Sequence, residues 1–363
     1  PDRTWQKIFV PYQPTSERKS MRKIATALAC TLALTLAGCA AGSSSATRDP
    51  ELKNTSVILD WTPNTNHTGI YVAQEKGFYR EAGLNVKVMG FSKSGVESVM
   101  AAKGADFGFS GTDSIASAKA SNLGIKMVFN LQPKSSYMVG FLVKADIQRP
   151  RDLDGKTLAD FGGGFQHIAT RMLIQKDGGK GDFKKVVAGA QTLQAVEQER
   201  ADFAELLSTW EGIEAEQSGY KLRYFDYEKY GVPTTPALLG ISTRADLIKE
   251  DPQLVRSFVQ ATQKGYQWAI DHPQEAAKIL LAANPQAKLD AKLVNASQEK
   301  LSKEYWPDAA GTVGHADMDK WQSYLDFIIE QKLVTDGDGK PYTQKISAPE
   351  VVTNEFLAKA ASK

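Results

Sequence analysis

Apolar and polar positions along the chain predict strands and helices in alternation. The apolar run 57–59 predicts a buried strand, and a polar stretch separates it from a helical segment that ends at Gly77. Residues 84–88 then alternate like a half-buried strand, and helix and strand patterns continue to take turns as far as Val143. This order predicts an α/β fold whose lobes are mixed, mostly parallel sheets flanked by helices.

Two interruptions of this pattern predict two lobes. Charged residues around Pro150 interrupt it at 144–154, and a Pro-containing stretch interrupts it again at 233–236. Beyond Leu254 the periodicity is helical, which predicts a helical C-terminal region. A lobe built from two segments is joined twice to the lobe inserted between them, so we expect a hinge and a ligand gap. The expected domains are lobe 1 at 55–145 plus 237–363 and lobe 2 at 146–236.

The N-terminal region resembles a bacterial lipoprotein leader. Residues 1–20 form a polar stretch that we expect to lie upstream of the folded protein or to be disordered, and 21–38 form the signal. Its apolar part, 24–36, is shorter than the roughly 20 residues that span a bilayer. Leu-Ala-Gly-Cys ending at Cys39 resembles a lipobox, and an ordinary cleaved signal is the alternative. A lipidated Cys39 and a flexible tether at 39–54 would hold the protein at the periplasmic or extracellular face of a membrane.

Composition removes several classes of function. The chain has 2 cysteines, Cys30 and Cys39, and both fall in the leader, so no thiol chemistry is expected downstream. The formal net charge of +2 includes the basic leader, and no nucleic-acid footprint is visible. The 4 histidines share no metal-ligand spacing, and the common hydrolase, nucleotide and zinc motifs are absent. We therefore expect no catalytic residues, no metal and no cofactor.

Polar loops at strand-to-helix junctions are the candidate binding residues, because ligands of open α/β sheets bind there. Trp61, Asn64 and His67 combine an indole, an amide and an imidazole in the first such loop. The alternative is that Trp61 packs on the sheet and Asn64 caps the helix. The full expected set is Trp61, Asn64, His67, Tyr71, Ser110, Thr112, Gly163, Gly164, Phe165, Trp210 and Glu211.

Glu211 has two interpretations that spacing alone does not separate. Ser208 and Glu211 fit a capping box, in which the carboxylate accepts a hydrogen bond from the Ser208 N–H. The same carboxylate beside Trp210 is also suited to ligand N–H groups.

One motif carries a family resemblance. The run D-W-T-P-N-T-N-H-T-G-I-Y at 60–71, followed by E-K-G-F-Y at 75–79, resembles the opening of solute-binding proteins for thiamine-pyrimidine precursors. These belong to the type II periplasmic binding proteins, whose relatives include riboflavin and sulfonate binders. The resemblance covers 57–246 and implies a two-lobed, Venus-flytrap fold, a monomer, and delivery of a small molecule to an ABC permease and its ATPase.

By position, the resemblance implies that Trp61 stacks on a flat ring, with Asn64 and His67 at its edge, and that Glu211 accepts N–H bonds from an aminopyrimidine. The expected ligand is a hydroxymethyl- or formylaminopyrimidine. Pyrimidine binders tend to carry further aromatic residues just before the Trp-Glu pair, where this chain has Leu207, Ser208 and Thr209, so a narrower aromatic sandwich or a different ring stays open.

Two alternatives to a pyrimidine binder follow from the same resemblance. Riboflavin or a small sulfonate would use the same scaffold, and an anion would require an Arg, for which Arg171 is the candidate. Related pyrimidine synthases use pyridoxal phosphate, and this chain has Ser110 and Ser114 where those enzymes have lysine and histidine. We therefore expect a binding protein and not an enzyme.

Overall fold

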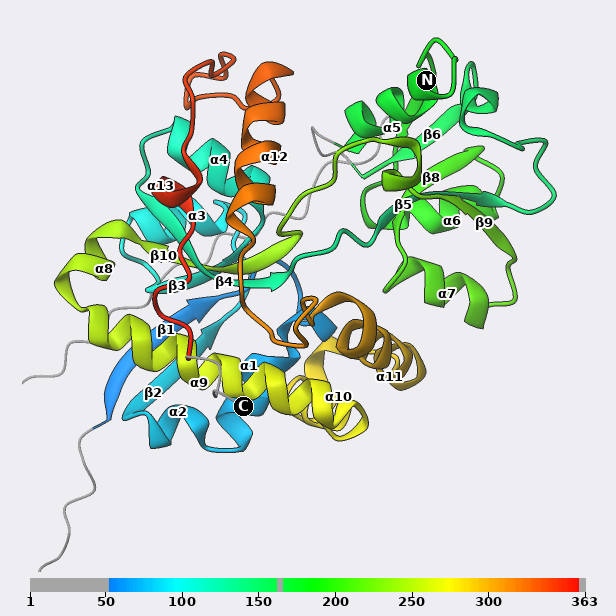
Figure 1. The fold of residues 1–363 in the computed structure, drawn as a ribbon. Helices are drawn as coiled ribbons and strands as arrows, with labels where there is room; N and C mark the ends of the chain where they lie inside the picture. The colour runs from blue at the N-terminus through cyan, green and yellow to red at the C-terminus, as the bar shows by residue number, and fades with distance from the viewer. Residues whose placement is uncertain (1–51, 162–165, 359–363) are drawn as a thin grey trace, which may run out of the picture. The chain divides into compact units, whose positions relative to one another are not determined.

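Two five-stranded sheets organise the part of the chain that the computed structural model describes, residues 52–161 and 166–358 (Figure 1). The first sheet has the strand order β2 (Leu84–Met89), β1 (Lys53–Ile58), β3 (Phe107–Ser110), β10 (Leu239–Arg244) and β4 (Ile125–Gln132). The second has the order β7 (Lys184–Val187), β6 (Thr157–Asp160), β8 (Phe203–Leu207), β5 (Tyr137–Leu142) and β9 (Leu222–Phe225). In each sheet one strand, β10 or β5, is antiparallel to its neighbours, so both sheets are mixed as predicted.

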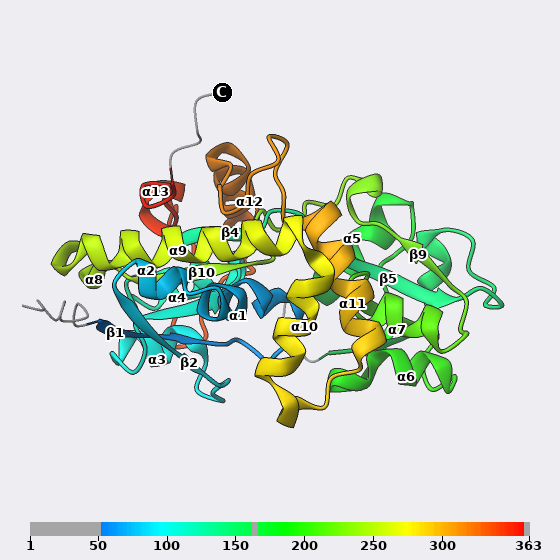
Figure 2. The ribbon, with the colours of Figure 1, turned by 90° about the horizontal axis from the view of Figure 1, so that it is seen from below.

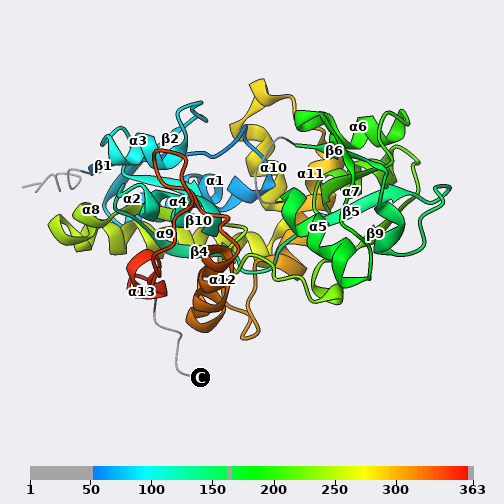
Figure 3. The same cartoon turned by 90° about the horizontal axis from the view of Figure 1, so that it is seen from above.

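Helices cover both faces of the first sheet. One face packs against α1 (Thr68–Glu75), α2 (Phe78–Glu81), α8 (Ala245–Glu250) and α9 (Pro252–Asp271), which Figure 2 shows in front of the strands. The other packs against α3 (Val96–Ala101), α4 (Thr112–Ala120), α12 (Met318–Glu330) and α13 (Ala348–Val351) (Figure 3).

The second sheet is also covered on both faces. Its helices are α5 (Gln166–Lys176) on one face and α6 (Thr192–Glu197) and α7 (Glu211–Gln217) on the other. Two further helices, α10 (Pro273–Ala283) and α11 (Ala291–Lys300), follow α9, and α11 contacts α7. The predicted α/β class with a helical C-terminal region is therefore confirmed.

The position of β5 corrects the expected domain boundary. Residues up to 145 were assigned to lobe 1, but β5 pairs with β8 and β9 in the second sheet. The chain therefore crosses between the sheets before Tyr137, directly after β4. Two consecutive apolar strands have the same pattern whichever sheet each one joins, so the sequence predicts the crossover at the charged stretch further along. In addition, β1 begins at Lys53, inside the segment expected to be tether.

The core of the first lobe is built against α9, whose apolar face was predicted from periodicity. Phe258, Val259 and Tyr266 are fully buried, and the Phe258 ring stacks on Phe107 with centroids 3.8 Å apart. Helices α1 and α9 approach closely because Gly69 lies beneath the Tyr266 ring. The Tyr266 hydroxyl donates a hydrogen bond to the Asn66 carbonyl at 2.6 Å, which holds the loop before α1.

Replacing Gly69 with alanine is expected to destabilise the protein by about 1–3 kcal/mol, because overpacking moves side chains or backbone. An added Cβ would lie 2.3 Å from Tyr266 Cγ. Urea denaturation measures the change, and Gly90→Ala is the matched control because a Cβ at Gly90 meets no atom within 4 Å. Equal unfolding midpoints for the two variants would contradict the close α1–α9 contact.

Candidate functional site

A cavity of about 330 Å³ lies where loops from the two sheets meet. We call it the indole cavity, after Trp61. The first lobe contributes the loop after β1, and the second lobe contributes the ends of β5, β6 and β8 and the start of α7. The residues that define it are Asp60, Trp61, Asn64, Tyr137, Phe161, Glu205, Thr209, Trp210, Glu211 and Glu214.

Trp61 lies on the wall of this cavity and is not packed beneath its own sheet. The side chain is 41% exposed. Its ring centroid lies 5.4 Å from that of Phe91 and 5.8 Å from that of Phe161, both in tilted arrangements. Phe91 follows β2 and Phe161 follows β6, so aromatic rings from both lobes flank the indole. An exposed ring with two aromatic neighbours offers a stacking surface to a flat ligand.

Asn64 lines the indole cavity, but its side chain is engaged in capping. Its Oδ1 accepts a hydrogen bond from the Asn66 N–H at 2.9 Å, and its Nδ2 donates to the Thr62 carbonyl at 3.0 Å. The capping interpretation of this amide is therefore the one that the contacts support, and its role toward a ligand stays a prediction.

His67 lines neither cavity described here and acts on Asp60 instead. The ring is fully buried and packs edge-on against Phe109. Its Nδ1 accepts a hydrogen bond from the Asn64 N–H at 3.2 Å, so the remaining hydrogen lies on Nε2, 2.8 Å from Asp60 Oδ1. The expectation that His67 meets the ligand edge is corrected: it orients a carboxylate that does line the cavity.

Tyr71 and Thr112 also lie away from the indole cavity. Tyr71 packs with Ala277 and Leu280 of α10 and lines a separate surface hollow on that side of α1. Thr112 is fully buried, and its N–H and hydroxyl both donate to the Ala237 carbonyl, at 3.0 and 3.2 Å. Neither side chain lines the indole cavity, so a ligand role for either residue stays a prediction.

Glu211 lines the indole cavity, and its carboxylate does not make the capping-box contact that was one of its two interpretations. Its Oε2 accepts a hydrogen bond from the Leu207 N–H at 3.0 Å, whereas the Ser208 N–H donates to the Ser136 carbonyl. The predicted capping box is therefore not formed. Burial raises the pKa of Glu211 above its ordinary value. The adjacent Trp210 is partly buried and lines the same cavity.

Sequence reasoning missed Glu205 on β8. Its side chain is 4% exposed and lines the indole cavity, and Thr170 of α5 donates to its Oε1 at 2.6 Å. Burial raises the pKa of Glu205 to about 8. A signal was present: Phe203, Glu205 and Leu207 share one face of a buried strand, and a carboxylate there needs an explanation.

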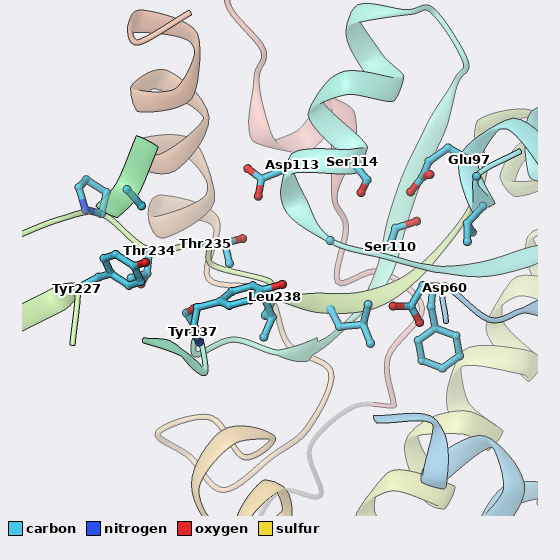
Figure 4. A pocket seen from close by; sticks show the side chains of 18 of the residues that line it. Asp60, Glu97, Ser110, Asp113, Ser114, Tyr137, Tyr227, Thr234, Thr235 and Leu238 are labelled. Atoms are coloured by element: carbon cyan, nitrogen blue, oxygen red, sulfur yellow. Dashed lines mark hydrogen bonds between the residues drawn. The ribbon is translucent and has the colours of Figure 1, made fainter. Parts of the chain in front are cut away.

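A second cavity of about 470 Å³ adjoins the first and shares Asp60 and Tyr137 with it. We call it the acidic cavity because Asp60, Glu97 and Asp113 line it, together with the predicted residue Ser110. Figure 4 shows Asp60, Glu97 and Ser110 on one side and Tyr137 on the other.

Burial shifts the pKa of two carboxyl groups of the acidic cavity. Burial raises the pKa of Glu97, and it raises the pKa of Asp113 to about 6. The Tyr324 hydroxyl donates to Asp113 Oδ1 at 3.0 Å, which favours the ionised form and opposes part of that rise.

The charged side chains described on the walls of both cavities are all acidic. No Lys or Arg is among the described residues that line either one, while six carboxyl groups are: Asp60, Glu97, Asp113, Glu205, Glu211 and Glu214. Arg171, the candidate for an anion, is exposed and lies over the Phe183 ring. Such a lining favours ligands that carry N–H donors or positive charge over anions.

Four predicted residues, Gly163, Gly164, Phe165 and Cys39, lie outside the described residues, as does the leader. Within residues 52–161 and 166–358 no group of three His, Cys, Asp or Glu side chains is arranged to hold a metal ion. In the same part of the chain, no helix combines the length and the apolar character needed to cross a bilayer.

Known proteins match the chain in sequence and in fold. Residues 64–276 match the family described as NMT1/THI5 like. The formylaminopyrimidine-binding protein of Halalkalibacterium halodurans is 28% identical over 309 residues, 81% of this chain and 92% of that protein. The 4-amino-5-hydroxymethyl-2-methylpyrimidine phosphate synthase of Legionella pneumophila is 22% identical over 235 residues, 64% of this chain and 74% of that protein.

Among solved structures, the periplasmic aliphatic sulphonate binding protein SsuA of Escherichia coli superposes with a TM-score of 0.65 at 12% identity, over 86% of this chain and 95% of that protein. This likeness shows the fold. The expected resemblance is confirmed: the chain belongs to the NMT1/THI5 like family and has the fold of the periplasmic solute-binding proteins.

Proposed function

We propose that this protein captures a thiamine-pyrimidine precursor, such as a formylamino- or hydroxymethylpyrimidine, and delivers it to an ABC permease and its ATPase. The ligand binds in the indole cavity, between groups contributed by the two lobes. Ligand binding favours the closed arrangement of the lobes, and that arrangement docks on the permease.

One observation carries the proposal: Trp61 and Glu211 line the same cavity, which no cation lines among the described residues. Stacking of a flat ring on the indole contributes about 0.5–1.5 kcal/mol beyond the buried area. A carboxylate that accepts ring-amino N–H groups makes the stronger, charge-assisted kind of hydrogen bond. A micromolar dissociation constant corresponds to about 8 kcal/mol, which a few such contacts and the burial of the ring supply.

The lining argues against a sulfonate ligand. A sulfonate would bring a negative charge beside Asp60 and Glu211, and no cation among the described lining residues would pair with it. Taking an unpaired charge out of water is costly, so the fold shared with a sulphonate binder does not extend to its ligand.

The lining also favours binding over catalysis. Ser110 and Ser114, which stand where the resemblance places the lysine and histidine of pyridoxal-phosphate-dependent synthases, both line the acidic cavity. A serine hydroxyl does not form the Schiff base by which lysine holds this cofactor.

Lipidation of Cys39 would keep the protein beside the membrane that carries the permease.

Isothermal titration calorimetry of the purified protein tests the proposal. Formylaminopyrimidine and hydroxymethylpyrimidine are expected to bind 1:1 with micromolar or tighter affinity, since the cavity is small and lined by groups that complement them. Methanesulfonate is the matched negative control. Binding of methanesulfonate, or of riboflavin alone, would overturn the proposed ligand class. An aldimine absorbance on addition of pyridoxal phosphate would instead favour an enzyme.

A further inference from the structure

We propose that Glu205 recognises the ligand by donating a hydrogen bond from Oε2 to an acceptor atom, a ring nitrogen or a carbonyl oxygen, inside the indole cavity. The inference rests on the proposed function and extends it: the ligand must present an acceptor toward β8 as well as N–H groups toward Glu211.

The first reason is an unsatisfied oxygen. Glu205 is 4% exposed, and its Oε2 has no hydrogen-bond partner among the described residues, although the side chain lines the cavity. Leaving a buried polar atom without a partner costs about 1–3 kcal/mol. A ligand that reaches Oε2 from the cavity removes this cost, so the bound state gains relative to the free protein.

The second reason is the direction of the hydrogen bonds at the other oxygen. Thr170 Oγ1 donates to Glu205 Oε1 at 2.6 Å, and the Tyr227 hydroxyl lies 2.9 Å from Thr170 Oγ1. The Tyr227 hydroxyl also lies 3.5 Å from Oε1 as a donor, so two hydroxyl donors face this oxygen. Oε1 is therefore an acceptor, and a neutral Glu205 carries its proton on Oε2.

The third reason is that the surroundings keep this carboxyl group neutral. The pKa of Glu205 is raised to about 8, by burial first and also by the negative Asp160, whereas the hydrogen bonds from Thr170 and Tyr227 and the nearby Lys185, which lies 3.7 Å from Asp160, oppose the rise. The other titratable groups around Glu205 are acidic or phenolic: Tyr227 contacts it, and the cavity wall adds Asp60, Tyr137, Glu211 and Glu214. Near neutral pH the group is therefore mainly a donor.

The sign of the pH dependence follows from this arrangement. A ligand acceptor binds the protonated form and raises the pKa of Glu205 further, so affinity is full below about pH 8 and falls as pH rises through that value. The loss approaches tenfold per pH unit. A ligand that presented an ammonium group to Oε2 would show the opposite trend.

Glu205→Gln and Glu205→Leu test the inference by calorimetry with formylaminopyrimidine between about pH 6 and pH 10. The glutamine amide keeps one acceptor for Thr170 and one donor for the ligand, so Glu205→Gln is expected to bind within about threefold of the native protein at neutral pH. It should also lose the decline that the native protein shows above pH 8. Glu205→Leu is expected to weaken binding by about tenfold or more at neutral pH.

A native affinity that does not change with pH, or equal affinities for all three proteins, would overturn the inference. The glutamine variant isolates Glu205, because the two proteins differ at that residue alone and are titrated with the same probe. If Glu205→Leu does not fold, the comparison of the native protein with Glu205→Gln decides.

If formylaminopyrimidine binds none of the three proteins, the proposed function fails for that probe. Infrared spectroscopy of the free protein then decides about Glu205. A neutral-carboxyl C=O band is expected at neutral pH, and Glu205→Gln should remove it. An identical spectrum for the two proteins would overturn the inference.

Discussion

Replacing Trp61 with alanine is expected to weaken formylaminopyrimidine binding by about 2–4 kcal/mol, or about 30-fold to 1,000-fold in Kd. The indole is 41% exposed and stands between Phe91 and Phe161, so a stacked ligand buries most of the remaining ring face. The substitution removes both the stacking and the apolar area that the complex buries. Calorimetry measures the loss of affinity.

Trp268→Ala is the matched control for this experiment. Trp268 of α9 is a partly buried tryptophan that lines neither cavity. Its ring stacks on His272, the residue that follows this helix. Its replacement should leave Kd unchanged, whatever it does to stability. If Trp61→Ala binds as tightly as Trp268→Ala, the ligand does not use the indole and the proposed site is wrong.

Replacing Phe258 with alanine is expected to destabilise the protein by about 3–5 kcal/mol. The ring is fully buried between β3 and α2: it stacks on Phe107 with centroids 3.8 Å apart and on Tyr79 with centroids 5.4 Å apart. Removing it leaves a cavity at the centre of the α9 interface, and the flanking rings lose their stacking partner. Urea denaturation measures the free energy of unfolding.

Phe91→Ala is the control for Phe258, because Phe91 is 44% exposed and its replacement should change stability by less than about 0.5 kcal/mol. Ligand affinity should respond in the opposite way. Phe91→Ala is the variant expected to change it, because Phe91 contacts Trp61 whereas Phe258 lies in the core. A loss of less than 1 kcal/mol for Phe258→Ala would mean that the α9 interface repacks around the missing ring.

The groups that line the indole cavity would determine which heterocycle the protein selects. In the proposed site, a ring face for stacking, an acceptor at Glu211 and a donor at Glu205 form a three-part pattern. Aminopyrimidines carry N–H groups and ring nitrogens side by side, so they match both polar positions at once. A ligand without an acceptor atom leaves Glu205 Oε2 without a partner, and such a mismatch rejects analogues strongly.

Patterns confined to one element were predictable from sequence. The buried face of α9 follows from helical periodicity, and α1 ends before Gly77, which adopts a left-handed conformation. The α/β class follows from alternating strands and helices, and the motif at 60–71 identified the family. These features depend on neighbours within a few residues, and the sequence displays those neighbours directly.

Features that depend on distant partners were not predictable in this way. The pairing of β5 with β8 and β9 depends on residues far along the chain from β5. The apolar pattern of β5 would be the same in either sheet. His67 was expected at the ligand, but its ring is held by Asp60 and the Asn64 N–H. Glu205 was overlooked because its partners, Thr170 and Tyr227, come from other elements.

The sequence by itself determined the class of fold, the family and the loop that carries Trp61. Only the tertiary structure decided which polar residues share a cavity and which of them hold the framework, and only it showed that the charged groups described on the cavity walls are carboxyl groups. The physical reason is that periodicity and motifs report local preferences, whereas burial, hydrogen-bond direction and proton affinity are set by atoms that the fold brings together from distant parts of the chain.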